Sequence, residues 1–167
     1  MWFLKRIFGT GGDSDTKRVA DTVSKIESGE VNKIYPILKP GDWVGIKYGV
    51  IKQTLLGTEE NPELVIGYGY DEPNDFIFMT HDMLQDKTVE QVYQEATKNL
   101  EEFDAPLNEV VPEKVIISDG ADFCSEKILN KTFMLELHKR LNAKELLVSI
   151  PRRRNMMVTS RQAEPAI

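Results

Sequence analysis

Cys124, the single cysteine of the chain, is the first candidate for chemistry. It follows a strand-like run, Val115–Ile117, and an Asp-Gly turn, where a helix is expected to begin. A thiol in the first turn of a helix faces unpaired backbone N–H groups, which stabilise the thiolate. With a histidine as base, such a thiolate could attack a carbonyl group, so a hydrolase is one hypothesis.

Two histidines could supply that base. His138 lies fourteen residues beyond Cys124 on the same expected helix, about 21 Å away along its axis, and cannot reach the thiol. His81, at the end of an expected strand, remains possible. The nearby acids Asp119 and Asp122 could complete a catalytic set, but their negative charges disfavour a thiolate. We therefore favour packing in the core as the role of Cys124.

The acidic residues have equally plain structural roles. Asp119 can form the turn with Gly120, and Asp119 or Asp122 can accept hydrogen bonds from the first N–H groups of the following helix. A metal ion or a ligand amine would compete for the same oxygens. Neighbouring His81 and Asp82 point to opposite faces if they lie on a strand, so they do not form a metal site together. We expect no metal and no cofactor.

Three consecutive arginines, Arg152, Arg153 and Arg154, form the most distinctive charged feature. They fall at the tip of an expected hairpin, where guanidinium groups could bind phosphate or an acidic partner. The aromatic residues typical of a single-strand nucleic-acid binder are absent from this tip. A solvated turn, a partner contact and self-association with the acidic body of the chain are the alternatives.

Trp2, Phe3 and Phe8 can share one face of a short helix, with Lys5 and Arg6 lying elsewhere. Amphipathic helices of this kind lie in membrane interfaces or dock on proteins. Residues 1–9 are too few to hold a membrane by themselves. Contact with a partner or with the chain's own domain is the simpler interpretation, and peripheral membrane attachment is the alternative.

Charge is unevenly distributed along the 167 residues. The net charge is −6; residues 1–18 carry +2 and residues 151–167 carry +3, which leaves −11 on the segment between them. An acidic body repels nucleic acid and anionic membranes, so general nucleic-acid binding is disfavoured.

One cysteine excludes an internal disulfide, and no apolar run approaches the roughly 20 residues of a membrane span. We expect a bacterial cytoplasmic protein.

The elements that must position these residues can be predicted from periodicity and turn signals. A helix is expected after Asp15 or Thr16, ending at Ser28-Gly29, and a second helix after a Thr88/Gln91 capping box. The segment 41–57 can form short strands or packed loop. The other expected elements are an extended segment over 33–38, a hairpin of 64–70 with 76–80, a strand over 115–117, a long helix over 122–142 and a hairpin of 145–150 with 156–159.

This order predicts an α+β fold: a mostly antiparallel sheet with about three helices packed on it, in a single domain. The domain is expected to cover 15–160, after an amphipathic or flexible segment over 1–14 and before a frayed tail over 161–167.

Several segments together resemble the bacterial family called domain of unknown function 1444. They are KIYPILKP, ELVIGYGYDEPNDFIFMTHDML, TVEQVYQEATKNL, ILNKTFMLELHKRL and LLVSIPRRRNMMV, spread over residues 30–158. The chain is shorter at both ends than is typical of the family. The resemblance implies the fold outline and a bacterial cytoplasmic setting, and it implies no activity and no site residues.

The sequence therefore favours a non-enzymatic protein-interaction or regulatory module. Its expected partner is another protein or a second copy of the chain, contacted through Arg152 to Arg154 and through Trp2, Phe3 and Phe8. The hydrolase that uses Cys124 or His81 with Asp119 or Asp122, and the peripheral membrane protein, remain the alternatives.

Overall fold

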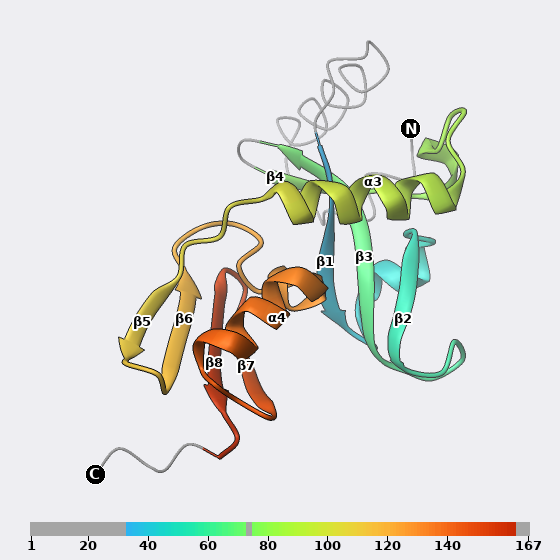
Figure 1. Cartoon of the computed structure of the whole chain (residues 1–167). Helices are drawn as coiled ribbons and strands as arrows, with labels where there is room; N and C mark the ends of the chain where they lie inside the picture. The colour runs from blue at the N-terminus through green and yellow to red at the C-terminus, as the bar shows by residue number, and fades with distance from the viewer. Residues whose placement is uncertain (1–32, 73–74, 163–167) are drawn as a thin grey trace. The chain divides into compact units, whose positions relative to one another are not determined.

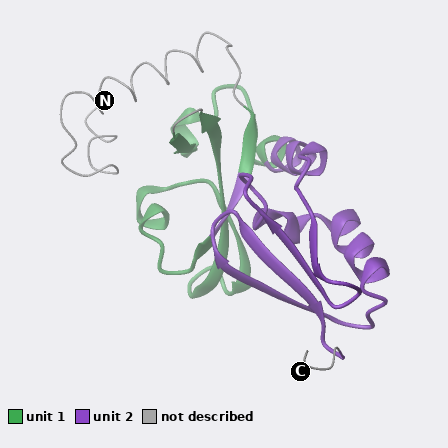
Figure 2. Cartoon of the chain, turned by 90° about the vertical axis from the view of Figure 1, so that its left-hand side faces the viewer, with its two compact units in different colours: residues 1–35, 39–92 green, residues 36–38, 93–167 purple. Residues whose placement is uncertain are grey.

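The computed structural model describes residues 33–72 and 75–162 (Figure 1). Within it the chain forms two compact units (Figure 2). Unit 1 comprises residues 1–35 and 39–92, and unit 2 comprises residues 36–38 and 93–167. Each unit is organised around a four-stranded sheet and is described by itself.

Unit 1 is built on a long central strand. Strand β3 (Pro62–Glu72) pairs antiparallel with β2 (Lys52–Gly57) through its first half and with β4 (Asp75–Phe78) through its second half. Strand β1 (Ile34–Pro40) lies on the other side of β3, at the edge of the sheet, as its proline predicts. The described part of unit 1 also contains two short 3-10 helices, η1 (Val44–Tyr48) and η2 (His81–Met83).

Glycines in the middle of β3 allow aromatic rings and a neighbouring strand to approach closely. A Cβ atom at Gly69 would lie 2.3 Å from the carbonyl oxygen of Ile77, so no larger residue fits there without a shift. The ring of Trp43 lies 4.5 Å from that of Phe78, and both rings lie against Gly67. This packing fixes the register between β3 and β4.

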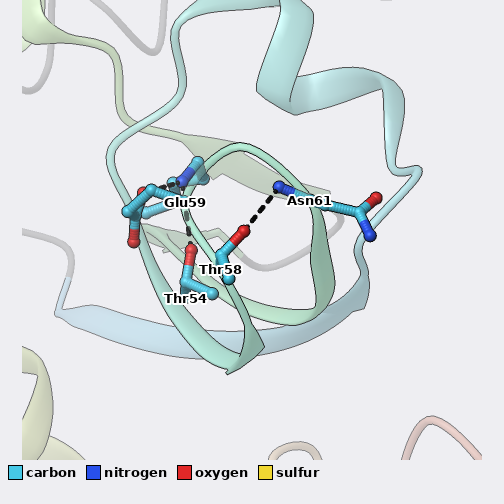
Figure 3. A network of polar contacts seen from close by, with 5 residues as sticks. Thr54, Thr58, Glu59 and Asn61 are labelled. Carbon is cyan, nitrogen blue, oxygen red and sulfur yellow. Dashed lines mark hydrogen bonds and ion pairs between the residues drawn. The ribbon is translucent and has the colours of Figure 1, made fainter.

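The turn between β2 and β3 is held by a small polar network (Figure 3). Lys52 Nζ lies 2.7 Å from Glu59 Oε2 and donates to Thr54 Oγ1 at 3.4 Å. The backbone N–H of Asn61 donates to Thr58 Oγ1 at 3.0 Å, which closes the turn. The hydrogen bond from Lys52 is the main reason that the pKa of Glu59 is lowered.

We predict that this network contributes stability at neutral pH and loses it in acid. A carboxyl group with a depressed folded-state pKa stabilises the fold above its unfolded pKa, and the contribution disappears as the pH falls through the folded value. The free energy of unfolding of Glu59→Gln, measured in urea, should lie below that of the parent at pH 7 and match it below the pKa of Glu59. Glu60→Gln is the control. The prediction would be contradicted if the free energies of unfolding of Glu59→Gln and the parent differed by the same amount at both pH values.

Helix α3 (Val89–Glu102) begins as the sequence predicts. The backbone N–H of Thr88 donates to Gln91 Oε1 at 2.8 Å, and the N–H of Gln91 donates to Thr88 Oγ1 at 3.2 Å. These reciprocal bonds confirm the capping box. The helix buries Val92, Ala96 and Leu100, which recur every four residues along one stripe.

Unit 2 contains the second sheet, in the order β5-β6-β8-β7, with antiparallel pairing throughout. Its strands are β5 (Asn108–Val111), β6 (Val115–Asp119), β7 (Leu146–Arg152) and β8 (Asn155–Ser160). Helix α4 (Lys131–Arg140) packs on the inner face of this sheet, in front of β7 and β8 in Figure 1. The core between them consists of Ile116, Met156 and Val158 from the sheet and Leu137 and Leu141 from the helical side.

The single long helix expected over 122–142 is wrong. The segment instead forms a 3-10 helix, η3 (Glu126–Leu129), followed by α4. Between them Asn130 has an extended backbone, and its side-chain oxygen accepts a hydrogen bond from the N–H of Phe133 at 3.0 Å. Asn130 is therefore an N-cap in the middle of the expected helix. The break explains why the apolar residues of this segment do not follow one helical stripe.

Most of the other expected elements are confirmed. The α+β class, the antiparallel pairing, both hairpins, the β1 segment and the 115–117 strand are present. The expectation of one sheet is wrong, because the described strands form two separate sheets. The described residues contain two α-helices, and the helix expected over 15–28 lies outside them. Strand β5 was not expected, and segment 41–57 contains both η1 and β2. A single domain over 15–160 stays a prediction.

We predict that Asn130→Ala lowers the free energy of unfolding by about 1 kcal/mol, because α4 loses its N-cap acceptor. Asn130→Asp keeps an acceptor at the same place and should lie close to the parent. Urea denaturation of both variants checks this. If the aspartate and alanine variants were equally destabilised, the cap would not be the cause.

Candidate functional site

The face of the unit 2 sheet that points away from α4 brings together several residues of functional interest. Strand register places eleven residues on it in three cross-strand rows, and we call this surface the outer face. Row one is Leu147, Thr159, Val115 and Val111; row two is Ser149, Met157, Ile117 and Asn108; row three is Arg152, Asn155 and Asp119.

Rows one and two are apolar or uncharged, and they remain accessible. Leu147 is 51% exposed and Met157 is 40% exposed, while Val115 and Ile117 are half-buried. The hydroxyl of Thr159 donates to the carbonyl oxygen of Lys114 at 2.8 Å, which satisfies it within the unit. These two rows therefore form a continuous, weakly polar patch across four strands.

Row three gives one end of the outer face its charge. Register places Arg152 and Asp119 on either side of Asn155, on strands β7 and β6. Asp119 Oδ1 accepts a hydrogen bond from Asn108 Nδ2 at 3.4 Å. Arg152 is exposed. A cation and an anion thus flank the central strand β8 in the same row.

Arg154, at the hairpin tip, makes contacts within unit 2. Its Nε lies 3.2 Å from Asp122 Oδ1, and its Nη2 donates to the carbonyl oxygen of Gly120 at 3.1 Å. Its backbone N–H donates to Ser125 Oγ at 3.2 Å, and its φ angle is 67°. Arg154 therefore fastens the β7–β8 turn to the loop that follows β6.

The Asp-Gly turn is confirmed, whereas the capping role of the acids is wrong. Asp119 ends β6, and Gly120 adopts a φ of 85°, a left-handed conformation that suits glycine. Asp122 pairs with Arg154, and the N-cap of α4 is Asn130. The acids are too far back along the chain to cap a helix that begins at Lys131.

Cys124 is fully buried, with 0% of its surface exposed. Its neighbour Phe123 is also buried and packs edge-on against Phe103, with ring centroids 5.5 Å apart. A substrate carbonyl cannot approach a thiol in this position without local opening. This burial is typical of a packed core cysteine.

His81 and Asp82 are exposed and begin η2 in unit 1. Asp82 accepts a hydrogen bond from the hydroxyl of Thr80. Among the residues that the structure describes, no cluster of three or more histidine, cysteine or acidic side chains could hold a metal ion. Trp2, Phe3 and Phe8 lie outside the described residues.

A feature that the sequence did not reveal is the buried lysine Lys127, which is only 3% exposed. Its ammonium group donates to the carbonyl oxygens of Leu100 and Phe103 at 3.0 and 2.8 Å, and lies 3.5 Å from that of Glu101. It also lies 5.0 Å from the centre of the Phe133 ring. A cation at these carbonyl groups supplies the hydrogen bonds that the C-terminal end of α3 lacks and balances the negative end of its helix dipole.

A groove of about 670 Å³ runs past this lysine. Its walls are the end of α3, the chain that follows it and α4 from Thr132 to Arg140, and its lining includes the acids Glu101, Asp104 and Glu136. Burial lowers the pKa of Lys127, and the charges of Asp104 and Glu101 oppose that effect. The carbonyl groups of Leu100 and Phe103 accept hydrogen bonds from two ammonium N–H groups, and the carbonyl of Glu101 lies near the third, which indicates a structural role for Lys127.

We predict that Lys127→Met lowers the free energy of unfolding by about 3 kcal/mol, because it leaves buried carbonyl groups at the end of α3 without a donor. Lys131→Met is the matched control at an exposed site and should change stability by less than about 0.5 kcal/mol. Urea unfolding gives both values. Similar stabilities for the two variants would contradict a structural role for the ammonium group.

Comparisons with known protein families, with curated proteins and with solved structures find no match to this chain. The resemblance to the family called domain of unknown function 1444 therefore stays a prediction. No helix among the described residues is long and apolar enough to cross a membrane.

Proposed function

We propose that this chain is a non-enzymatic protein-interaction module that binds another polypeptide through the outer face of unit 2. One observation carries the proposal. Strands β6, β7 and β8 have apolar residues on both faces, a pattern typical of strands covered on both sides, whereas α4 covers only the inner face. An exposed apolar patch of this kind marks an interaction surface.

The side chains on the outer face suit a protein contact. Burying the exposed half of Leu147 or Met157 contributes about 1 kcal/mol each. Arg152 at the rim adds a charged group that can select a partner and orient it. Of the partner-binding residues expected from the sequence, this surface uses Arg152, whereas Arg154 is engaged within the unit.

Charge supports a protein partner rather than a nucleic acid. The segment between the two basic ends carries −11, and rows one and two contain no basic side chain to contact phosphates. The burial of Cys124 gives no support to the hydrolase alternative. A bacterial cytoplasmic setting, implied by the family resemblance, is part of this proposal.

We predict that a photo-crosslinking side chain at position 149 captures a polypeptide in cells that express the full chain. Ser149 is exposed in row two, beside Met157. The same probe at Glu136, exposed on α4, is the control. Adducts should form at 149 and not at 136, and Leu147→Asp should reduce them at least tenfold, because it places a charge in the apolar patch. Equal labelling at both positions, or insensitivity to Leu147→Asp, would contradict the proposal.

A further inference from the structure

We infer that the polypeptide covering the outer face is a second copy of this chain, related to the first by a two-fold axis. This inference rests on the proposed function, because it names the partner of the same surface. It follows from the distribution of charge in the three rows and from the symmetry that a contact between identical faces requires.

Like charges disfavour contacts between two copies of a chain with a net charge of −6. A face that meets itself must therefore either lack charge or carry both signs in matching positions. Rows one and two meet the first condition, since none of their eight residues is charged. Row three meets the second condition, because it carries both the cation Arg152 and the anion Asp119.

A two-fold axis that runs parallel to β8 and lies midway between the two facing β8 strands satisfies the geometry. It stacks two sheets face to face with their strands aligned, as in β-sandwiches. Strand β8 then faces β8 of the second copy, so that Met157 meets its own symmetry mate. Strand β7 faces β6 of the second copy, which places Leu147 over Val115.

The same axis pairs the charges. Arg152 and Asp119 lie in one row, on the two strands that flank β8. Rotation about this axis therefore brings Arg152 of each copy over Asp119 of the other, and two equivalent ion pairs form. Such reciprocal complementarity favours a second copy over a partner of one charge.

The contact is small. Eleven residues on each side are fewer than the roughly 20–30 of a standard interface. We therefore expect a reversible dimer that dissociates on dilution, in the micromolar range or above.

Sedimentation velocity of the full chain over a hundredfold range of concentration tests the inference. The weight-average mass should rise toward twice that of the chain. Leu147→Arg should raise the dimer dissociation constant at least tenfold, because it places a cation in the apolar rows. Leu135→Arg is the matched control: Leu135 is 50% exposed on α4, close to the exposure of Leu147, and its replacement should leave the dimer unchanged.

Charge exchange tests the predicted pairing. Arg152→Asp and Asp119→Arg should each weaken the dimer about tenfold, because each creates two like-charge contacts. The double variant restores opposite charges across the axis and should recover most of the parent affinity. Circular dichroism of each variant checks that the fold is retained, and a variant that unfolds is replaced by Arg152→Ala or Asp119→Asn, each expected to weaken the dimer less.

Three results would overturn the inference. They are a chain that stays monomeric at all concentrations, equal effects of Leu147→Arg and Leu135→Arg, and adducts of the position 149 probe with a different protein or with residues 1–32 of the same molecule. An adduct with a different protein would leave the proposed function intact. If no adduct formed specifically at the outer face, both the proposed function and the dimer would be contradicted.

Discussion

The organisation of unit 2 depends on two adjacent charged residues that are almost fully buried. Lys127 donates to backbone carbonyls at the end of α3, and Glu126 accepts from the N–H of Leu38 and from the hydroxyl of Ser125. Neither charge could remain inside the fold without these partners, because an unpaired buried charge is strongly unfavourable. The short helix η3 therefore joins an early strand segment, the end of α3 and the start of α4. Loss of Lys127 would disturb the end of α3 and the start of α4, and loss of Glu126 would disturb the contact with the early strand segment.

This arrangement also explains how the outer face is presented. With η3 and α4 fixed on the inner side, Ile116, Met156 and Val158 are buried against Leu137 and Leu141. The alternate residues of the same strands must then point to the other side. Arg154 holds the β7–β8 turn to the loop after β6, through Asp122 and Gly120, so row three has a defined position. The apolar patch is thus a consequence of the strand register and of a core that covers one face only.

Local signals allowed much of the fold to be predicted, and long-range contacts account for what was missed. The Thr88/Gln91 cap and the hairpins depend on residues close together in sequence. The break at Asn130 escaped prediction because asparagine is also tolerated within helices. The contacts of Lys127 in η3 with residues 100–103 join segments that are far apart in the sequence, and no local pattern indicates them. The outer face was missed for a related reason. The segments LLVSI and MMV indicate strands that are apolar on both sides, but only the register between strands shows which residues of different strands lie together on one face. Cys124 is buried, as the packing interpretation expects, and its role stays a prediction. No change of composition along the sequence indicated the two units.

The link between Lys127 and α3 has a consequence for synthesis on the ribosome. The carbonyl groups of Leu100 and Phe103 leave the exit tunnel before the lysine that satisfies them, which follows 27 and 24 residues later. Until then only water can donate hydrogen bonds to these carbonyl groups, so the last turn of α3 stays frayed in the nascent chain. Strands β7 and β8 emerge later still and complete the sheet. Unit 2 therefore reaches its final packing only after β8 has emerged, whereas the hairpin of β3 and β4 can pair much earlier.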